Sequence, residues 1–464
     1  MANYDLTAFR GLTFHDAVPA FFDGNDTPRD YLERCLEVIN VREPVVKAFA
    51  NLNEDNARKA ADASTKRYKD GRILSTIDGL PISIKDLLET KDMPTQMGCE
   101  AYIGNFPKND NAAVWALRQA GAVVFGKTVT AELGGTHPGS TTNPFDPERT
   151  PGGSSSGSAA AVAAGMVPAA IGTQVGGSII RPAAFCGNVA LKPTQGAINR
   201  GERQATSMST HGVHANCIED MWQSAIEIAK RAGGDRGYQG LYGPDEPPAP
   251  VKPERLIVLE SAGWAELDQS SRSAFEGLLE NLQQADVTLL RRSDHVLVEV
   301  LEQKIAEAGE ICGAITRWEN RWAQQNLIAI KGEFVSDRFK ANLKLAQEMS
   351  HDDYRSALIA RDVAQHCHNT VAHLANAAIT LSCPGPAPIW AGDVQGLPLA
   401  DRPTGDAIFN YPSSMLFAPC VTMPLMSVGG LPVGAQVMGQ QHQDADITAI
   451  SRWILNNISP VVSA

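Results

Sequence analysis

The stretch that decides the fold runs from Pro151 to Pro193 and reads PGGSSSGSAAAVAAGMVPAAIGTQVGGSIIRPAAFCGNVALKP. It consists mainly of Gly, Ser and Ala, and two Gly-Gly-Ser turns, which end at Ser154 and Ser178, bracket an alanine-rich segment. Because such small residues let backbone segments approach one another and a ligand closely, the stretch predicts a compact, buried unit. We expect residues 158–165 to form a buried helix, since alanine favours helices, and residues 168–173 to form a short buried strand. Two serines carried by turns on one unit are candidates for covalent chemistry.

A reactive serine needs a base beside it, and this stretch contains no histidine. The nearest candidate upstream is Lys85, at the end of a short strand predicted over residues 82–84. A lysine acts as a base only in its neutral form, so its pKa must fall from the usual value of about 10.4. Burial in apolar surroundings lowers a lysine pKa, and the neighbouring isoleucines favour such burial. The alternative interpretation is an ordinary surface lysine at the end of a strand.

The combination of Lys85, Ser154 and Ser178 resembles the Ser–cis-Ser–Lys triad of the amidase signature family. Several motifs carry the resemblance, and together they cover most of the chain. In chain order, the matching segments are GLPISIKD (79–86), GKT (126–128) with Glu132, Asn143-Pro144, GGSSSGSAAAVAAG (152–165), GTQVGGSIIRPAAFCG (172–187), LKPT (191–194) and GLPVGAQ (430–436).

This resemblance implies a role for each member of the triad. Ser178 attacks the carbonyl carbon of the substrate, and Ser154, which follows a cis peptide bond in the family, relays the proton. Lys85 is the final base and later returns a proton to the leaving amine. The resemblance also implies an oxyanion hole made of the backbone N–H groups of Val175, Gly176, Gly177 and Ser178. One donor of this kind typically lowers the reaction barrier by about 3–4 kcal/mol.

The sequence defines the substrate contacts less well. Arg181 is a candidate anchor for an anionic or polar acyl group, because a guanidinium binds a carboxylate in bidentate fashion; a structural salt bridge is the alternative. Gly153 and Met97 are further candidates for contact with the substrate. Gln174 and Val175 stand where many family members carry Asp-Thr. The resemblance therefore does not define the substrate.

Three other patterns point to different chemistry. Residues 121–128 fit the Walker A pattern, but their four middle residues read as a strand, whereas a phosphate-binding loop follows a strand. Residues 153–157 fit the GxSxG nucleophile elbow, but no hydrophobic strand directly precedes them. A metal site at His366, His368 and His373 is not expected, because the first two point in different directions on the predicted helix.

The composition is that of an ordinary soluble globular protein, with 43% hydrophobic and 20% charged residues. The net charge of −12 argues against nucleic-acid binding, which usually needs basic patches. The N-terminal residues lack a signal-peptide pattern, and no long apolar run indicates a membrane span. The eight cysteines include no CxxC pair, which favours reduced thiols in a cytoplasmic protein. No metal or organic cofactor is expected.

Alternating strands and helices predict an α/β fold. A helix should begin at Thr27-Pro28, with threonine as the N-cap and proline in the first turn. A strand should cover residues 45–52, and a long helix residues 352–377. The strand–helix–strand run over residues 256–290 indicates a parallel βαβ unit.

The resemblance implies one large domain over residues 1–464, with a mixed twisted β-sheet covered by helices on both faces. The signature core of this domain would span about residues 75–220. A helical region over about residues 290–375 would form a wall of the substrate pocket.

The expected function is an amidohydrolase that cleaves the C–N bond of a carboxamide through an acyl-enzyme on Ser178. Carbamates, urethanes and esters share the same tetrahedral chemistry and are alternative substrates. The second hypothesis is a glutamine-hydrolysing A subunit of a tRNA-dependent amidotransferase, which needs partner proteins and a path for ammonia. The third hypothesis is a binding protein without enzymatic activity. The presence of all three triad residues argues against it. The expected partner is a small-molecule substrate, and the resemblance is compatible with a homodimer.

Overall fold

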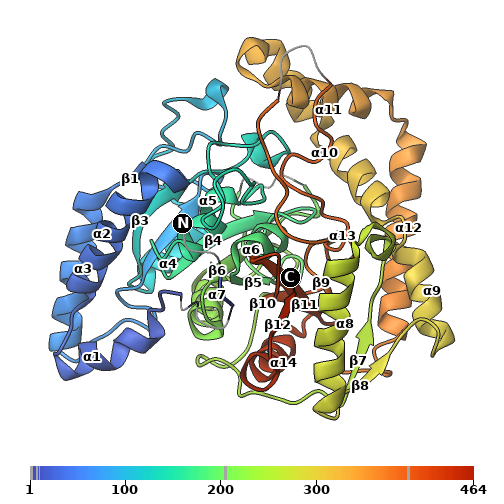
Figure 1. Cartoon of the computed structure of the whole chain (residues 1–464). Coiled ribbons are helices and arrows are strands. Elements are labelled where there is room, and N and C mark those ends of the chain that lie inside the picture. The colour runs from blue at the N-terminus through green and yellow to red at the C-terminus, as the bar shows by residue number, and fades with distance from the viewer. Residues whose placement is uncertain (1–3, 7–8, 10, 203–205, 394–397, 464) are drawn as a thin grey trace.

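A single mixed β-sheet forms the centre of the protein. The computed structural model describes residues 4–6, 9, 11–202, 206–393 and 398–463. The strands of the sheet are β1 (Phe49–Leu52), β2 (Pro81–Lys85), β3 (Val123–Thr128), β4 (Ala169–Gln174), β5 (Val189–Lys192), β6 (Thr210–Ala215), β7 (Arg255–Val258), β8 (Thr288–Leu290), β9 (Ala377–Leu381), β10 (Cys420–Val428), β11 (Leu431–Met438) and β12 (Val461–Ser463). They lie in the order β1-β3-β2-β4-β6-β5-β10-β11-β9-β7-β8, and β12 pairs with β10 (Figure 1).

Helices cover both faces of this sheet. The α-helices of the described residues are α1 (Val18–Asp23), α2 (Pro28–Val46), α3 (Glu54–Lys69), α4 (Ala112–Gln119), α5 (Ser156–Ala163), α6 (Ile180–Cys186), α7 (Ile218–Ala232), α8 (Gln269–Gln284), α9 (Val296–Ile305), α10 (Ala308–Lys331), α11 (Asp337–Glu348), α12 (His351–Thr370), α13 (Tyr411–Met415) and α14 (Asp444–Asn457). On one face α4, α7, α8 and α14 share an apolar core with the sheet. On the other, α2, α3 and α5 form one cluster, and α6, α9, α10 and α12 form a second. None of these helices combines the length and apolar character that crossing a bilayer requires.

Strand β3 shows why both faces need a cover. Val124 belongs to the core of the first face, whereas Val123 and Phe125 belong to a core of the second face. All three side chains are buried. Because successive side chains of a strand point to opposite faces, such an apolar run is stable only between two layers of helices.

The sheet is mixed, with parallel pairs on either side of an antiparallel centre. β2 runs parallel to β3 and β4, and β7 runs parallel to β8 and β9, whereas the pairs from β4 to β9 along the sheet are antiparallel. The unit β7–α8–β8 is the parallel βαβ unit predicted over residues 256–290, which is confirmed. The predicted α/β fold, a single domain with a mixed sheet between helices, is confirmed as well.

Helix α5 is the alanine-rich segment of the signature stretch, and it is buried along its whole length. Small residues make this possible, most clearly at Gly157, whose N–H donates to Val129 O at 2.9 Å. A Cβ at this position would lie 2.2 Å from Ala48 O and 2.5 Å from Val129 N. Glycine therefore lets the helix that follows Ser154 rest directly on the backbone after β3.

We expect Gly157→Ala to lower the free energy of unfolding by roughly 2–3 kcal/mol, because the added methyl group would meet backbone atoms. The matched control is Gly277→Ala in α8, where the nearest atom lies 3.5 Å from the added Cβ. That substitution should stabilise the protein by up to about 1 kcal/mol, since alanine favours helices. Urea unfolding followed by circular dichroism measures both changes, and equal effects would contradict the packing argument.

The N-terminal elements differ in one respect from the prediction. Helix α2 begins at Pro28 with Thr27 as its N-cap, as expected. The helix continues to Val46, however, so the strand predicted over residues 45–52 is wrong in its first half and β1 begins only at Phe49. Val46 is buried in the cluster of α2, α3 and α5. Packing against that core outweighs the weak preference of valine for strands.

Two further helices differ from the sequence-based prediction. The helix predicted over residues 352–377 is too long, because α12 ends at Thr370 and a turn leads into β9. Helix α6, which directly follows Ser178, was not predicted at all. Its Pro182 lies in the first turn, where backbone N–H groups have no partner within the helix. A proline, which would break the interior of a helix, is therefore compatible with the start of α6.

Candidate active site

Lys85 is the last residue of β2 and is fully buried. Its Nζ lies 2.7 Å from Ser154 Oγ, and 2.9 Å from both Ser155 Oγ and Thr173 Oγ1. All three partners are uncharged hydroxyl groups. Burial, and after it the positive charge of Arg181, lower the pKa of Lys85 well below its usual value. The site therefore favours the neutral amine that can act as a base.

Ser154 lies at the turn that leads into α5. The peptide bond between Gly153 and Ser154 is cis, as the resemblance implies. The carbonyl oxygen of Ser154 accepts a hydrogen bond from Ala131 N at 3.0 Å, and only 2% of the residue is exposed. These contacts hold the Ser154 hydroxyl in the interior, beside Lys85.

Ser178 lies in the loop between β4 and α6 and is half-buried, so it is more exposed than Lys85 and Ser154. Its carbonyl oxygen accepts a hydrogen bond from Ser155 N at 3.3 Å. The two Gly-Gly-Ser turns are thus in direct contact, although a helix and a strand separate them in the sequence. A buried amine and a buried hydroxyl behind a more accessible serine is the arrangement that the predicted triad requires.

The loop over residues 175–178 presents free backbone donors. The N–H groups of its four residues have no acceptor within the described part of the chain. The loop is closed by Gln174, whose Oε1 accepts hydrogen bonds from Ile179 N at 2.8 Å and from Ile180 N at 3.0 Å. Free N–H groups on a fixed turn are the donors that an oxyanion hole needs.

The loop over residues 175–178 packs against α13 and the residue that precedes it. A Cβ at Gly177 would lie 2.6 Å from Asn410 Oδ1, so glycine is required there for close contact. Ser414 Oγ donates to Gly176 O at 2.8 Å, and Gln174 Nε2 lies 3.1 Å from the same hydroxyl. Gln174 therefore fixes the loop at both ends.

We expect Gln174→Leu to lower kcat by about 10- to 100-fold with a smaller change in KM, because small misplacements of catalytic groups have effects of this size. Ser414→Ala removes the contacts with Gly176 O and Gln174 Nε2 but leaves both hydrogen bonds to Gln174 Oε1, so it should have a weaker effect. Steady-state kinetics of both variants measure the difference. Unchanged kcat in Gln174→Leu would show that the loop holds its shape without this side chain.

Comparison with known proteins agrees with this geometry. The family model of amidases matches residues 30–447. The chain belongs to the amidase signature family. The A subunit of the glutamyl-tRNA(Gln) amidotransferase of Chloroflexus aggregans is 30% identical over 96% of both chains. The protein of the same name from Chloroflexus aurantiacus is 45% identical over 201 residues, which is 42% of this chain and 41% of that relative. A crystal structure of an amidase is 28% identical with a TM-score of 0.83, covering 97% of this chain and 100% of that chain.

Membership of the amidase signature family confirms the predicted family and reaction class, because amidases hydrolyse C–N bonds. The similarity to amidotransferase subunits also bears on the second hypothesis of the sequence analysis. The alignment at 45% identity covers less than half of that relative, whereas the one at 30% identity covers nearly all of it.

Arg181 of this amidase signature protein lies in the first turn of α6, with 8% of its surface exposed. Its Nη2 donates to Gly153 O at 2.6 Å and to Thr404 Oγ1 at 3.0 Å, and its Nη1 donates to Gly405 O at 2.7 Å. Both terminal nitrogens donate to the protein, whereas Nε has no hydrogen-bond partner among the described residues. Contact of Arg181 with an acyl group therefore stays a prediction. The alternative salt bridge is not formed within the described residues, since all three acceptors are uncharged.

The other two candidates for substrate contact are held by backbone interactions. The carbonyl oxygen of Gly153 accepts from Arg181, as described above. Met97 is 2% exposed; its N–H donates to Asp86 Oδ2 at 3.0 Å, and its carbonyl oxygen accepts from Leu133 N at 2.8 Å. Contact of either residue with substrate stays a prediction.

The segment that fits the Walker A pattern has a structural explanation. Residues 123–128 form β3, which contains three of the four residues, 122–125, that were expected to form a strand, and Lys127 is fully buried within it. Lys127 Nζ lies 2.9 Å from Asp86 Oδ1 and donates to Thr95 Oγ1 at 2.7 Å. This buried ion pair holds β3 to the end of β2. Within the described residues, no group of three or more His, Cys, Asp or Glu side chains could hold a metal ion.

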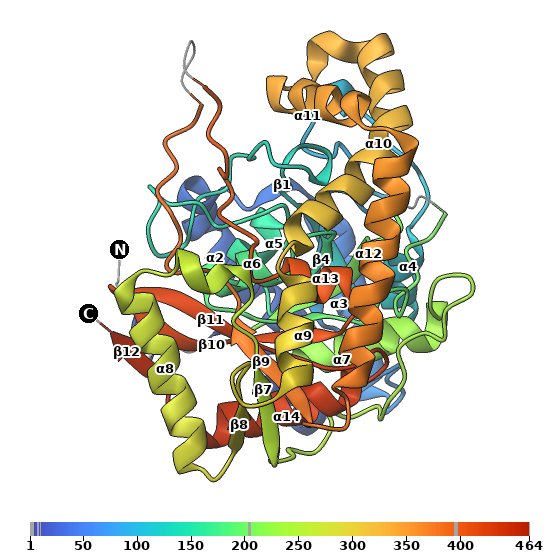
Figure 2. The same cartoon turned by 90° about the vertical axis from the view of Figure 1, so that its right-hand side faces the viewer.

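Helices α10, α11 and α12, here called the arm, stand out from the body of the protein (Figure 2). The base of the arm is buried against the cluster that contains α6, through Ile311 and Ile315. Its tip is fixed by Ser336, the N-cap of α11, whose backbone N–H donates to Glu132 Oε1 at 2.9 Å and whose hydroxyl donates to Glu132 Oε2. Glu132 follows Ala131, which binds the carbonyl of Ser154. The arm thus links the α6 side of the site to the loop beside Ser154.

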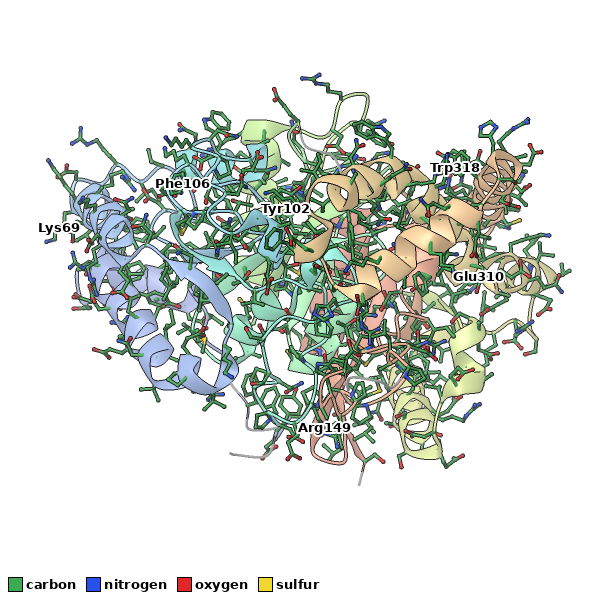
Figure 3. All side chains as sticks on the ribbon, turned by 90° about the horizontal axis from the view of Figure 1, so that it is seen from above. Lys69, Tyr102, Phe106, Arg149, Glu310 and Trp318 are labelled. Atoms are coloured by element: carbon green, nitrogen blue, oxygen red, sulfur yellow. The ribbon has the colours of Figure 1, made fainter. Side chains whose placement is uncertain are left out.

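A small apolar cluster reinforces the tip of the arm. It joins Cys99 and Ala101 to Val335, with Leu133 at its edge. Lys331 Nζ donates to Ala101 O and lies 5.6 Å from the ring centre of Tyr102. Figure 3 shows Tyr102 beside the arm, whereas Phe106 lies farther away. The tip of the arm is therefore fixed to residues 99–102 and to the loop that follows β3.

Sequence reasoning missed two residues that touch Lys85. Thr173 provides one of the three hydroxyl groups around the Lys85 amine, and Ser155 was considered only as part of the GxSxG pattern. A signal was present, because Ser155 directly follows the first Gly-Gly-Ser turn and Thr173 lies shortly before the second. Only the pairing of β2 with β4 shows that Thr173 faces the lysine.

Proposed function

We propose that this protein hydrolyses the C–N bond of a carboxamide through an acyl-enzyme on Ser178. The observation that carries the proposal is the contact of a buried lysine, whose pKa is lowered by burial, with Ser154, directly behind the turn of Ser178. The free N–H groups of residues 175–178 support the proposal, since they could stabilise an oxyanion.

In the first step, Ser178 Oγ forms a bond to the carbonyl carbon of the amide. Its proton passes to Ser154 Oγ while the proton of Ser154 passes to Lys85 Nζ, which becomes an ammonium group. The carbonyl oxygen takes up the electron pair and becomes an oxyanion facing the N–H groups of residues 175–178. The lowered pKa of Lys85 favours the neutral amine, whose lone pair accepts the proton in this step.

In the second step, the C–N bond breaks and the leaving nitrogen takes a proton back from Lys85 through Ser154. The acyl group stays on Ser178 as an ester. A water molecule then attacks this ester, and its proton follows the same path to Lys85. Release of the acid returns Ser178 to its hydroxyl form. Carbamates, urethanes and esters would follow the same route with a different leaving group.

The test is intact mass measurement after incubation with a small sulfonyl fluoride, on the wild type, Ser178→Ala and Lys85→Met. We expect one adduct on the wild type and none on either variant. A panel of anilides, primary amides, carbamates and aryl esters then defines the substrate class. Absence of an adduct on the wild type, or an adduct that survives in Ser178→Ala, would contradict the proposed nucleophile.

The second candidate is glutamine hydrolysis as the A subunit of a tRNA-dependent amidotransferase. The similarity to amidotransferase subunits favours it. Such a protein needs partner chains, so the purified chain alone should turn over glutamine poorly and co-purify with other subunits. Rapid turnover of simple amides by the isolated chain would exclude this candidate as the main function.

We also propose a cytoplasmic location, supported by eight free cysteines, as is usual in a reducing compartment. The partner of the site would be a small molecule. A homodimer is a further proposal, which light scattering of the purified protein tests directly. Residues 75–220 would be the signature core, and the helical region over residues 290–375 a wall of the pocket.

A further inference from the structure

Arg181 carries a buried charge without a direct counterion. Its guanidinium donates to Gly153 O, Gly405 O and Thr404 Oγ1, all of which are uncharged. No carboxylate of the described residues lies within ion-pair distance, and Asp406, the acid whose charge acts on it, pairs with Arg402. Buried charges are usually paired, because desolvation is costly. An unpaired one beside a catalytic centre points to a function.

The charge lies directly behind the contact between relay and base. The acceptor Gly153 O belongs to the peptide bond that joins Gly153 to Ser154, and Ser154 Oγ lies 2.7 Å from Lys85 Nζ. One peptide group therefore separates the guanidinium from this contact. A Cβ at Gly153 would lie 2.9 Å from Thr404 Cγ2, which shows how closely the segment around Thr404 is packed on the turn.

We propose that Arg181 is a positioning residue of this site, which fixes the Ser154 turn through the Gly153 carbonyl and disfavours a second positive charge on Lys85. The inference rests on the proposed function, in which Lys85 must be neutral to act as a base.

The other charged groups around Lys85 do not supply this effect. His211 and His214 lie on β6 near the lysine, and burial lowers the pKa of both to about 3, so neither is charged at neutral pH. Asp86 and Lys127 lie beside the end of β2 and neutralise each other. The side chains that touch Lys85 Nζ are all hydroxyls. Arg181 is thus the charged group whose removal should change the protonation of Lys85.

The experiment measures how fast a small sulfonyl fluoride labels Ser178 from about pH 5 to about pH 10, corrected for hydrolysis of the reagent. The labelling rate follows the neutral fraction of Lys85 and needs no known substrate. Arg181→Gln removes the charge and keeps a donor, whereas Arg181→Lys keeps the charge and loses the fork of donors. Thr404→Val, the matched control, removes one acceptor of the same guanidinium.

The acid limb is the pH range in which the labelling rate rises as Lys85 loses its proton. In Arg181→Gln we expect this limb to move up by about one pH unit, so labelling below the limb is about tenfold slower. Arg181→Lys should keep the limb of the wild type with a lower plateau, because the charge remains while the turn is held less firmly. Thr404→Val should keep the limb as well. A merely structural role would lower the plateau of Arg181→Gln without moving its limb.

An unchanged limb in Arg181→Gln, or a limb in Arg181→Lys that moves as far as in Arg181→Gln, would overturn the inference. If Arg181→Gln does not fold, as judged by circular dichroism, Arg181→Lys decides alone: a limb at the wild-type position supports the inference and a raised limb overturns it. Failure of the wild type to be labelled at any pH would instead remove the proposed function and this inference with it.

Discussion

Ser178→Ala should lower kcat/KM by roughly 10⁵- to 10⁶-fold, the size of effect that removal of a nucleophile has in other serine hydrolases. The substitution deletes the atom that forms the acyl-enzyme. The fold should not change, because the turn is held by the backbone of Ser178 and by Gln174 rather than by the serine hydroxyl. Hydrolysis of the best substrate from the panel measures the loss.

The matched control for this variant is Ser156→Ala. Ser156 belongs to the same run of serines, and its hydroxyl donates to Val129 O at 3.2 Å rather than contacting Lys85. We expect its activity to stay within a few-fold of the wild type. Comparable losses in both variants would show that the serine run acts through the fold, and the assignment of Ser178 as nucleophile would have to be withdrawn.

Lys85→Met should lower kcat/KM by about 10⁴-fold or more, because both serines lose the base that accepts their protons. Methionine has a similar length, so it fills the buried space without leaving a cavity. The double variant with Ser178→Ala should be no worse than Ser178→Ala alone, since the lysine acts only through the serine. Additive losses would contradict a shared proton path.

The pH dependence of the wild type follows from the same lysine. Protonated Lys85 is inactive, so activity should rise with pH through its pKa and be present at neutral pH, since burial and Arg181 lower that pKa. An unperturbed lysine would instead give full activity only above about pH 10. A profile of kcat/KM against pH distinguishes the two, and a limb near pH 10 would contradict a buried neutral base.

The sequence predicted the parts of the site that depend on local chemistry. The two Gly-Gly-Ser turns, the small residues of α5 and the short strand that ends at Lys85 were all readable, because each is encoded by neighbouring residues. The cis bond before Ser154 followed from the family resemblance and is present. The acceptors that hold the terminal nitrogens of Arg181 were not predicted, since a guanidinium with no acidic neighbour in sequence reads as free to bind an anion.

The surroundings of Lys85 and Arg181 were decided by contacts between segments that are far apart in the sequence. Thr404 and Gly405 lie more than 220 residues after Arg181, yet they occupy its donors, so its role depends on where that later segment lies in the fold. Thr173 reaches Lys85 only because β4 pairs with β2. Ser336 binds Glu132 only because the arm returns to the body. The sequence by itself determined the fold class and the candidate serines and base, since small residues and turns act locally. The tertiary structure alone decided which groups surround that base, because burial and hydrogen bonding there are set by residues far apart in the chain.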